Sequence, residues 1–151
     1  MMTEAPPPEH ERRMVVQKLD LWRRARGEEP GLPLKTALEN DFIEIAPSSF
    51  VLEVADGNAE PTFVSIGAAV CDSRDQGLAG RPISSADPES LLGHALQSLN
   101  NVLNKKVPAT TSGTYNDASG KKISYRCILL PIGAASENVV FVLGAISFKT
   151  D

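Results

Sequence analysis

The side chains able to do chemistry are few in this sequence. It has two cysteines, Cys71 and Cys127, and two histidines, His10 and His94. A cysteine becomes a nucleophile when a histidine or another cation lowers its pKa, and a structural zinc site needs four ligands at characteristic spacings. No histidine is placed to serve as the base of either cysteine, and the spacings fit no zinc site. We therefore expect two reduced thiols, no metal and no cofactor.

Sequence motifs of the common catalytic sites are also absent. The chain contains no G-x-S-x-G, no phosphate-binding loop and no H-E-x-x-H. A small enzyme of the cone-shaped α+β class would need a carboxylate in its pocket, and Glu53 is the best candidate for that base. Because Glu53 alternates with apolar neighbours in a strand pattern, we expect it to point outward. The sequence thus predicts a protein that is not an enzyme, with the cone-fold enzyme as an alternative.

The composition and net charge of the chain limit the classes of partner that we expect it to bind. The chain has 151 residues, 42% of them hydrophobic, with a net charge of -4 and a pI of about 5.2. An acidic chain of this size predicts one domain and disfavours nucleic acid or an anionic membrane as a general partner. No stretch approaches the ~18 apolar residues of a membrane span, and the first residues lack the apolar core of a signal peptide. We expect a cytoplasmic protein that does not insert into membranes.

The chain divides into four parts by composition. Residues 1–8 end in three prolines and are predicted to form a disordered tail. Residues 9–27 are predicted to form an amphipathic helix, residues 28–49 a connector, and residues 50–151 the folded core. The helix places three apolar residues at positions i, i+4 and i+7, which are Val15, Leu19 and Trp22. A stripe this narrow must dock on another element, because an isolated helix of this length is marginal in water.

Within the core, the pattern predicts two strands, a glycine-rich crossing, a helix and three more strands. The strands are expected at 50–55, 62–66, 109–115, 122–131 and 139–149, and the helix at 90–105 with Asp87 as its N-cap. A short helix is expected around 38–45. The last strand is apolar on both faces, which predicts a central position in the sheet. We expect the N-terminal helix to cover the outer face of that sheet, in the same subunit or in a partner's.

Short sequence signatures in this order resemble a family of small single-domain bacterial PAS-like proteins. They comprise an L..WR..RG pattern at Leu19, Trp22, Arg23, Arg26 and Gly27, an LP pair at Leu32 and Pro33, and strand and turn signatures at 50–54, Gly67, Leu78 with Gly80, and 125–131. The sequence departs from the family at Gln76, where an aromatic residue is common. The resemblance implies a five-stranded antiparallel sheet with helices on its concave face. It also implies an N-terminal dimerisation helix on the outer face and a regulatory role.

PAS domains differ in the cofactor that they bind, so each possible cofactor is judged by the residues that it requires. The VCDSRD segment around Cys71 is not the flavin-binding cysteine motif of PAS photosensors. Haem-binding PAS domains usually take a histidine from the long helix, where His94 lies. On the helical wheel, however, His94 is nearly opposite Leu92, Leu96 and Leu99, so we expect it to be exposed to solvent. His10 is expected to be solvated.

Two functions follow from the resemblance. The first is a stand-alone PAS-like regulatory module in signal transduction that acts through protein-protein interaction. Its interface would be Val15, Leu19 and Trp22, and its partners a second copy of itself, giving a homodimer, and a signalling protein. The second is a sensor that holds a small apolar ligand in a haem-free pocket lined by Phe63, Leu96, Tyr125 and Cys127.

Overall fold

The computed structural model describes residues 7–28, 31–39, 47–54, 60–133, 139 and 141–150. It contains helices and strands in the order predicted for the core. The helices are α1 (Pro7–Arg26), α2 (Leu34–Glu39), α3 (Leu91–Ala95) and α4 (Leu99–Lys105). The strands are β1 (Ser49–Glu53), β2 (Thr62–Ile66), β3 (Ala109–Asn116), β4 (Lys122–Ile132) and β5 (Phe141–Thr150). No helix among the described residues is long and apolar enough to pass through a bilayer.

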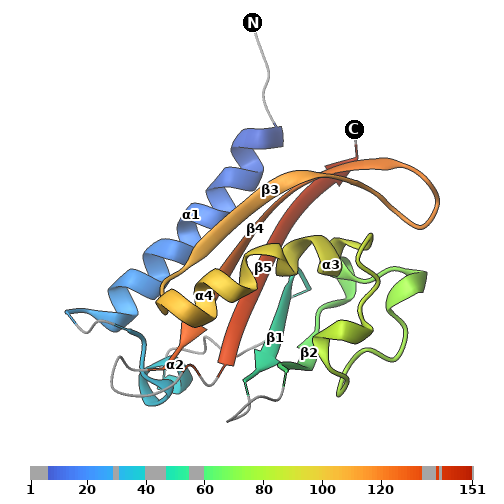
Figure 1. Cartoon of the computed structure of the whole chain (residues 1–151). Helices are drawn as coiled ribbons and strands as arrows, with labels where there is room; N and C mark the ends of the chain where they lie inside the picture. The colour runs from blue at the N-terminus through green and yellow to red at the C-terminus, as the bar shows by residue number, and fades with distance from the viewer. Residues whose placement is uncertain are drawn as a thin grey trace, which may run out of the picture.

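The strands form one antiparallel sheet with the order β2-β1-β5-β4-β3 (Figure 1). The central position of β5 confirms the prediction made from its two apolar faces. Val142 and Ile146 belong to the core on one face of the sheet, and Leu143 and Ala145 to the core on the other. The predicted fold class, an α+β protein with a five-stranded antiparallel sheet, is therefore confirmed.

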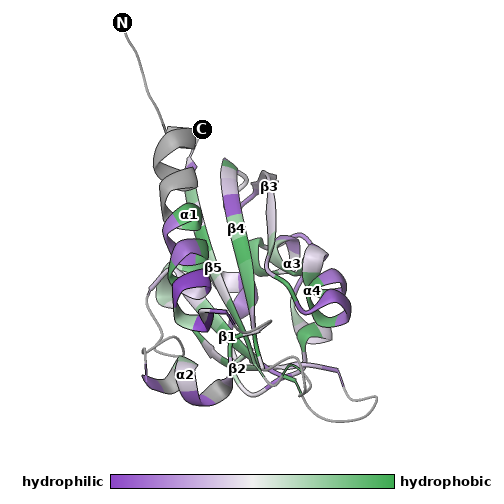
Figure 2. Cartoon of the chain, turned by 90° about the vertical axis from the view of Figure 1, so that its left-hand side faces the viewer, coloured by the Kyte–Doolittle hydropathy of each residue, from purple (hydrophilic) through white to green (hydrophobic). Residues whose placement is uncertain are grey.

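Two layers of helix cover the two faces of this sheet (Figure 2). The larger core lies between the concave face and α3, α4 and the crossing segment, and includes Phe50, Phe63 and Leu92. The smaller core lies under α1, where Val51, Ile128, Leu130 and Leu143 are at most 2% exposed. The central parts of β4 and β5 are thus covered on both faces, at Ile128, Leu130, Val142 and Leu143.

Helix α1 docks on the outer face of its own chain's sheet. Val15 is 5% and Trp22 2% exposed, and Leu19 packs against the same core. The indole Nε1 of Trp22 donates a buried hydrogen bond of 2.8 Å to the carbonyl oxygen of Pro131 on β4. Burial of each such side chain contributes about 1.5–3 kcal/mol. Of the two arrangements left open by the sequence, the stripe therefore takes the one within the same subunit.

The ends of α1 follow from proline and glycine geometry. The helix begins at Pro7, two residues before the predicted start at Glu9. Proline is tolerated in the first helical turn because its missing N–H has no partner there. Gly27 ends the helix with a φ of +59°, and its N–H bonds to the carbonyl of Arg23. The predicted tail, residues 1–8, otherwise lies outside the described residues.

The glycine-rich crossing after β2 folds back along the edge of that strand. Its short 3₁₀ turns are Ala68–Val70, Ser73–Asp75 and Ile83–Ser85. Gly77 and Gly80 have φ angles of +74° and +85°, where a side chain would be strained. Gly67 has a φ of -68°, so its backbone does not require glycine. The main effect of the crossing is thus to wrap two tight turns over the concave face.

Two predicted helices differ from those observed. The single helix expected at 90–105 is divided by a 3₁₀ turn at Leu96–Ser98, a common form of mid-helix interruption. Its N-cap is Ser90, whose Oγ accepts a hydrogen bond from the N–H of Gly93, whereas Asp87 caps the preceding turn. The short helix expected around 38–45 is α2, which begins earlier, at Leu34. Residues 40–46 and the predicted turn at 56–58 lie outside the described residues.

Candidate functional site

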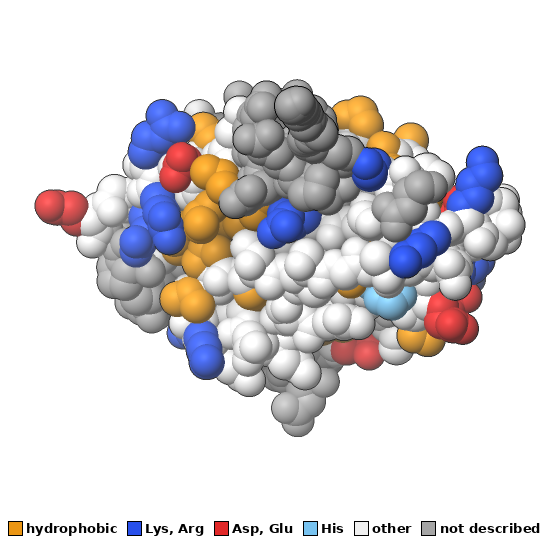
Figure 3. Space-filling model, turned by 90° about the horizontal axis from the view of Figure 1, so that it is seen from above, with side chains coloured by type: hydrophobic (Ala, Val, Ile, Leu, Met, Phe, Trp, Pro, Cys, Tyr) orange, Lys and Arg blue, Asp and Glu red, His pale blue; other side chains and the backbone are white. Residues whose placement is uncertain are grey.

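A groove of about 370 Å³ runs between α1 and the start of β3. The wall on α1 includes Leu19 and Trp22, and the opposite wall is the segment that joins α4 to β3. The full lining is Leu19, Trp22, Arg23, Arg26, Val107, Pro108, Thr110 and Ile128. Seen from above, apolar side chains gather with lysine and arginine side chains around them, and acidic side-chain atoms also lie at the margin of this patch (Figure 3). The groove thus combines an apolar floor with positive charge.

The cations of the groove are positioned by helical spacing. Arg26 lies one turn beyond Trp22, and its guanidinium carbon is 5.0 Å from the centre of the indole ring, a cation–π contact. Arg23 is exposed and follows Val16 by seven residues, so both lie on the same flank of α1. Lys105, at the end of α4, is also exposed and comes just before the opposite wall. On a chain of net charge -4, these residues make a local basic surface.

Exposed apolar side chains extend the groove on both sides. Val16 on α1 and Val107 before β3 are each 46% exposed. Val107 lines the groove with Leu19 and Pro108, and Val16 lies on the flank of α1 that also carries Arg23. Such a surface suits a partner that offers both an apolar group and a negative charge.

The predicted interface residues divide between this groove and the core below it. Trp22 and Leu19 line the groove, while Val15 is buried under α1 and lies outside the lining. Their main structural role is to hold α1 on the sheet. The residues that sequence reasoning missed are Val107, Pro108 and Thr110. In the sequence, Val107 is an apolar residue between Lys106 and Pro108. The interpretation of Pro108 as the end of a helix did not explain why an apolar residue lies there.

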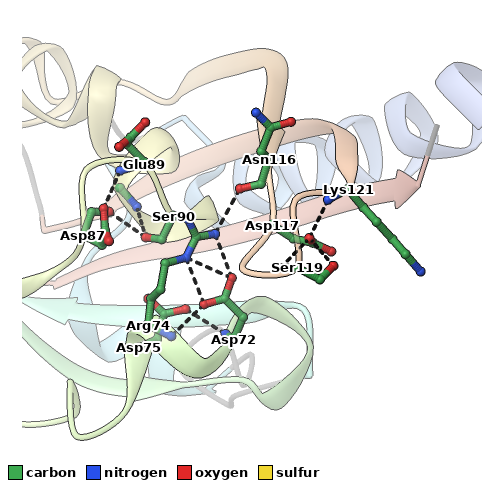
Figure 4. Close-up of polar contacts among 11 residues, drawn as sticks. Asp72, Arg74, Asp75, Asp87, Glu89, Ser90, Asn116, Asp117, Ser119 and Lys121 are labelled. Atoms are coloured by element: carbon green, nitrogen blue, oxygen red, sulfur yellow. Dashed lines mark hydrogen bonds and ion pairs between the residues drawn. The ribbon is translucent and has the colours of Figure 1, made fainter.

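A second, polar site lies where the crossing meets the β3–β4 hairpin (Figure 4). Arg74 forms an ion pair of 2.8 Å with Asp72 and donates to the carbonyl oxygen of Asn116, at 3.1 Å. The hydrogen bond from Arg74 holds the pKa of Asp72 below its usual value. Arg74 thus ties the crossing to the end of β3.

Asp75 is the buried acid of this polar site. It is 5% exposed, and its Oδ2 accepts a 2.8 Å hydrogen bond from the backbone N–H of Asp72, which closes a capping box. Burial raises the pKa of Asp75, and the neighbouring Asp72 adds to the rise. A cleft of about 310 Å³ opens above Arg74 and is also lined by Glu89, His94, Thr114, Tyr115, Asn116 and Asp117.

His94 does not have the position predicted for it. It is half-buried, and its ring centre lies 5.8 Å from that of Tyr115 and 5.7 Å from that of Tyr125. The expectation of a solvent-facing histidine assumed one continuous helix. Because α3 ends at Ala95 and lies against the hairpin, its flank meets the two tyrosines.

Three of the four predicted pocket residues are packed in the main core. Phe63, Tyr125 and Cys127 are at most 4% exposed, and Phe63 makes an edge contact with Phe50. Burial raises the pKa of Cys127 to about 12. Leu96 lies at the rim, where it lines a groove of about 360 Å³ with Glu60, Ile83, Ser84, Ala86, Pro88 and Gly93.

The remaining reactive candidates have no activating environment. Cys71 is half-buried, and burial together with Asp75 and Asp72 raises its pKa, which disfavours the thiolate. Glu53 is exposed at the end of β1, so the carboxylate proposed for a cone-fold enzyme does not line a pocket in the core. Among the described residues, no three His, Cys, Asp or Glu side chains gather to hold a metal ion.

Comparison with known proteins agrees with this architecture. The sequence matches the model of a family described as PAS domain over residues 11–147, which is most of the chain. The chain belongs to the PAS domain family. No curated protein matches it.

Solved PAS and LOV domains have similar folds. The PAS domain of the fruit-fly ELK potassium channel is 18% identical, with a TM-score of 0.50 over 78% of this chain and 98% of that one. The PAS domain of Bordetella pertussis BvgS is 12% identical, with a TM-score of 0.49 over 78% and 87%. The LOV domain of the blue-light photoreceptor Aureochrome1 is 16% identical, with a TM-score of 0.49 over 69% and 88%. At 18% identity and a TM-score of 0.50, the similarity to the ELK domain shows the PAS fold alone.

Proposed function

We propose that this PAS domain is a regulatory module that passes its state to a protein partner through α1 and the groove beside it. The partner is a signalling protein, and a second copy of the chain is the expected partner in a homodimer. The observation that carries the proposal is the groove itself, in which apolar side chains and two arginines line one surface.

Two features of α1 support this role. Its inner side is held on β4 and β5 by Trp22 and Val15, and through these contacts a movement of the strands would reach the helix. Its flank meanwhile carries exposed Val16 and Arg23 toward the groove. A helix coupled to the sheet on one side and open on another is suited to relay a change between the core and a partner.

Deletion of α1 is a poor test, because it would uncover the apolar core formed by Val51, Ile128 and Leu130. Point changes on the exposed side avoid this problem. We expect light scattering after gel filtration to give twice the 16.2 kDa chain mass for the wild type. Val16→Lys and Val107→Lys should give the monomer, while Val64→Lys, equally exposed but on β2, should leave the dimer intact. A wild-type monomer at every concentration would remove self-association from the proposal.

A small-ligand sensor is the second candidate function. The observation that favours it is the groove at Leu96, whose other apolar members Ile83, Ala86 and Pro88 lie at the edge of the main core. A small apolar ligand entering there would contact Leu96, Ile83 and Ala86 at the edge of the core. Native mass spectrometry of freshly purified protein tests this function. A bound mass lost in Leu96→Trp supports it, and an exact apoprotein mass together with no melting shift across a metabolite panel opposes it.

A further inference from the structure

We propose that the free edge of β3 binds an extended segment of a partner protein, as an added strand, and that this segment carries apolar and acidic residues. This inference rests on the proposed function, since it names the chemistry of the partner at the same groove. The two edges of the sheet, the charge of the groove and the residues of the hairpin tip support it.

The two edges of the sheet differ in whether other segments of the chain bond to their backbone groups. At the β2 edge, the N–H of Phe63 bonds to the carbonyl of Arg81 at 2.9 Å, and the N–H of Gly80 bonds to the carbonyl of Phe63 at 2.7 Å. A bridge between Thr62 and Pro82 continues this seal. The crossing segment therefore occupies the edge backbone groups at the start of β2, around Phe63, a usual protection against unwanted pairing.

The β3 edge has no such seal among the described residues. No backbone hydrogen bond outside the β3–β4 ladder reaches the strand interior, and only Arg74 contacts its last carbonyl, that of Asn116. The strand has 8 residues, ATTSGTYN, with no charge and no proline. Natural edges are normally blunted by lysine, proline or a bulge. A long, uncharged and unpaired edge is a template for a further strand.

The register of the hairpin shows which residues an added strand would meet. Thr110 pairs with Ile128 and Ser112 with Arg126, and both Thr110 and Ile128 line the groove beside α1. Outward-facing side chains of an added strand at this end would therefore point toward Leu19 and Val107. The acidic residues would lie beside Arg23, which makes no ion pair with any described residue. In Figure 3, a band of uncharged surface extends from the patch of apolar and basic side chains.

A second copy of the chain is a poorer occupant of this edge. Symmetric antiparallel pairing over the whole of β3 would bring the Asn116 end of one copy to the Ala109 end of the other. The hairpin tip carries Lys121 and Lys122, and the carboxylate of Asp117 is already engaged by the N–H groups of Ser119 and Lys121. Positive charge would then face the basic rim of the groove. Charge complementarity favours a different protein that supplies carboxylates.

A synthetic peptide matched to the 8 residues of β3 tests the inference directly. The probe alternates valine with threonine and ends in two glutamates at its C-terminus. Antiparallel addition, the more stable pairing, places these glutamates next to Ala109 and the arginines. Three control peptides are needed: one with the glutamates at the N-terminus, one with lysines in their place, and one with alternate backbone amides N-methylated. Binding is followed by amide chemical shifts of the labelled full chain.

We expect saturable shifts along β3 and none along β2, up to about 1 mM peptide. Arg23→Glu should weaken binding about fivefold, and Ser112→Lys should weaken it further by placing a charge on the edge. Val64→Lys, on the opposite edge, should leave binding unchanged. Absence of saturable shifts on β3, or equal binding of the N-methylated peptide, would overturn the inference. The proposed function would survive that result if native partners were still captured through Arg23, so the two failures are distinguishable.

Discussion

The attachment of α1 to the sheet depends on one side chain more than on any other. Trp22 is 2% exposed, and its indole N–H is bonded to the Pro131 carbonyl. Trp22→Ala removes both the ring and the donor, and we expect a loss of about 3–5 kcal/mol of unfolding free energy. Trp22→Phe keeps an aromatic ring but leaves the buried carbonyl unpaired, which costs about 1–3 kcal/mol.

The matched control is Leu21→Ala, one residue away on the same helix. Leu21 is 45% exposed, so its truncation should change stability by no more than about 0.5 kcal/mol. Urea unfolding followed by far-UV circular dichroism measures all three variants. Fluorescence is unsuitable for this comparison because Trp22 is the single tryptophan of the chain.

The three variants should therefore rank as Trp22→Ala, then Trp22→Phe, then Leu21→Ala, from most to least destabilised. For a chain of this size, each kcal/mol corresponds to a shift of about 2–4 °C in Tm. Equal stabilities for Trp22→Ala and Leu21→Ala would refute the docking of α1 through its tryptophan, and with it the coupling of the helix to β4.

Three further predictions concern the core and its titratable groups. Gly144 lies opposite Phe50, and a Cβ added at Gly144 would collide with the Phe50 ring. Gly144→Ala should therefore lower the free energy of unfolding by about 1–3 kcal/mol in a denaturant titration. Adding Phe50→Leu to that variant should recover part of the loss, and full additivity of the two changes would argue against the contact. Burial raises the pKa of Tyr115 to about 12 and also raises the pKa of Tyr125, so absorbance at alkaline pH should show both tyrosines of the folded protein ionising above the pH of a free phenol. Because the folded pKa of Tyr115 lies above the unfolded value of 10.0, its contribution to stability is full below pH 10 and is lost as pH rises toward about 12; a normal tyrosine titration with the fold intact would contradict this. A thiol reagent should label half-buried Cys71 before Cys127, because Cys127 is 1% exposed and its pKa is raised to about 12. Peptide mass mapping measures the order of labelling, and the reverse order would be incompatible with the core described.

The periodicity of apolar residues predicted most of the fold, because the burial of those residues decides which face of each element packs inward. The two-faced apolar pattern of β5 placed it at the centre of the sheet, and the stripe of Val15, Leu19 and Trp22 identified the helix that covers the outer face. Element boundaries were less accurate where local geometry decides them. The 3₁₀ turn at Leu96–Ser98 leaves no mark in a helical apolar pattern, and neither does the choice of Ser90 over Asp87 as the cap.

The site was less predictable than the fold, since it depends on contacts distant in sequence. Arg23 and Arg26 were visible as charges at a helix end, but their neighbours Val107 and Thr110 are about eighty positions away along the chain. The environment of His94 likewise depends on where the β3–β4 hairpin places Tyr115 and Tyr125. The contrast between a sealed β2 edge and an open β3 edge becomes visible only once the strand order is known.

The central claim is that the groove beside α1 binds a protein partner, and affinity capture from native extract tests it most directly. The wild-type chain, Arg23→Glu and the control Val64→Lys should be compared at equal amounts by quantitative mass spectrometry. We predict a signalling protein that the wild type and Val64→Lys retain equally and that Arg23→Glu loses. Capture of the same proteins in the same amounts by all three chains would contradict the account.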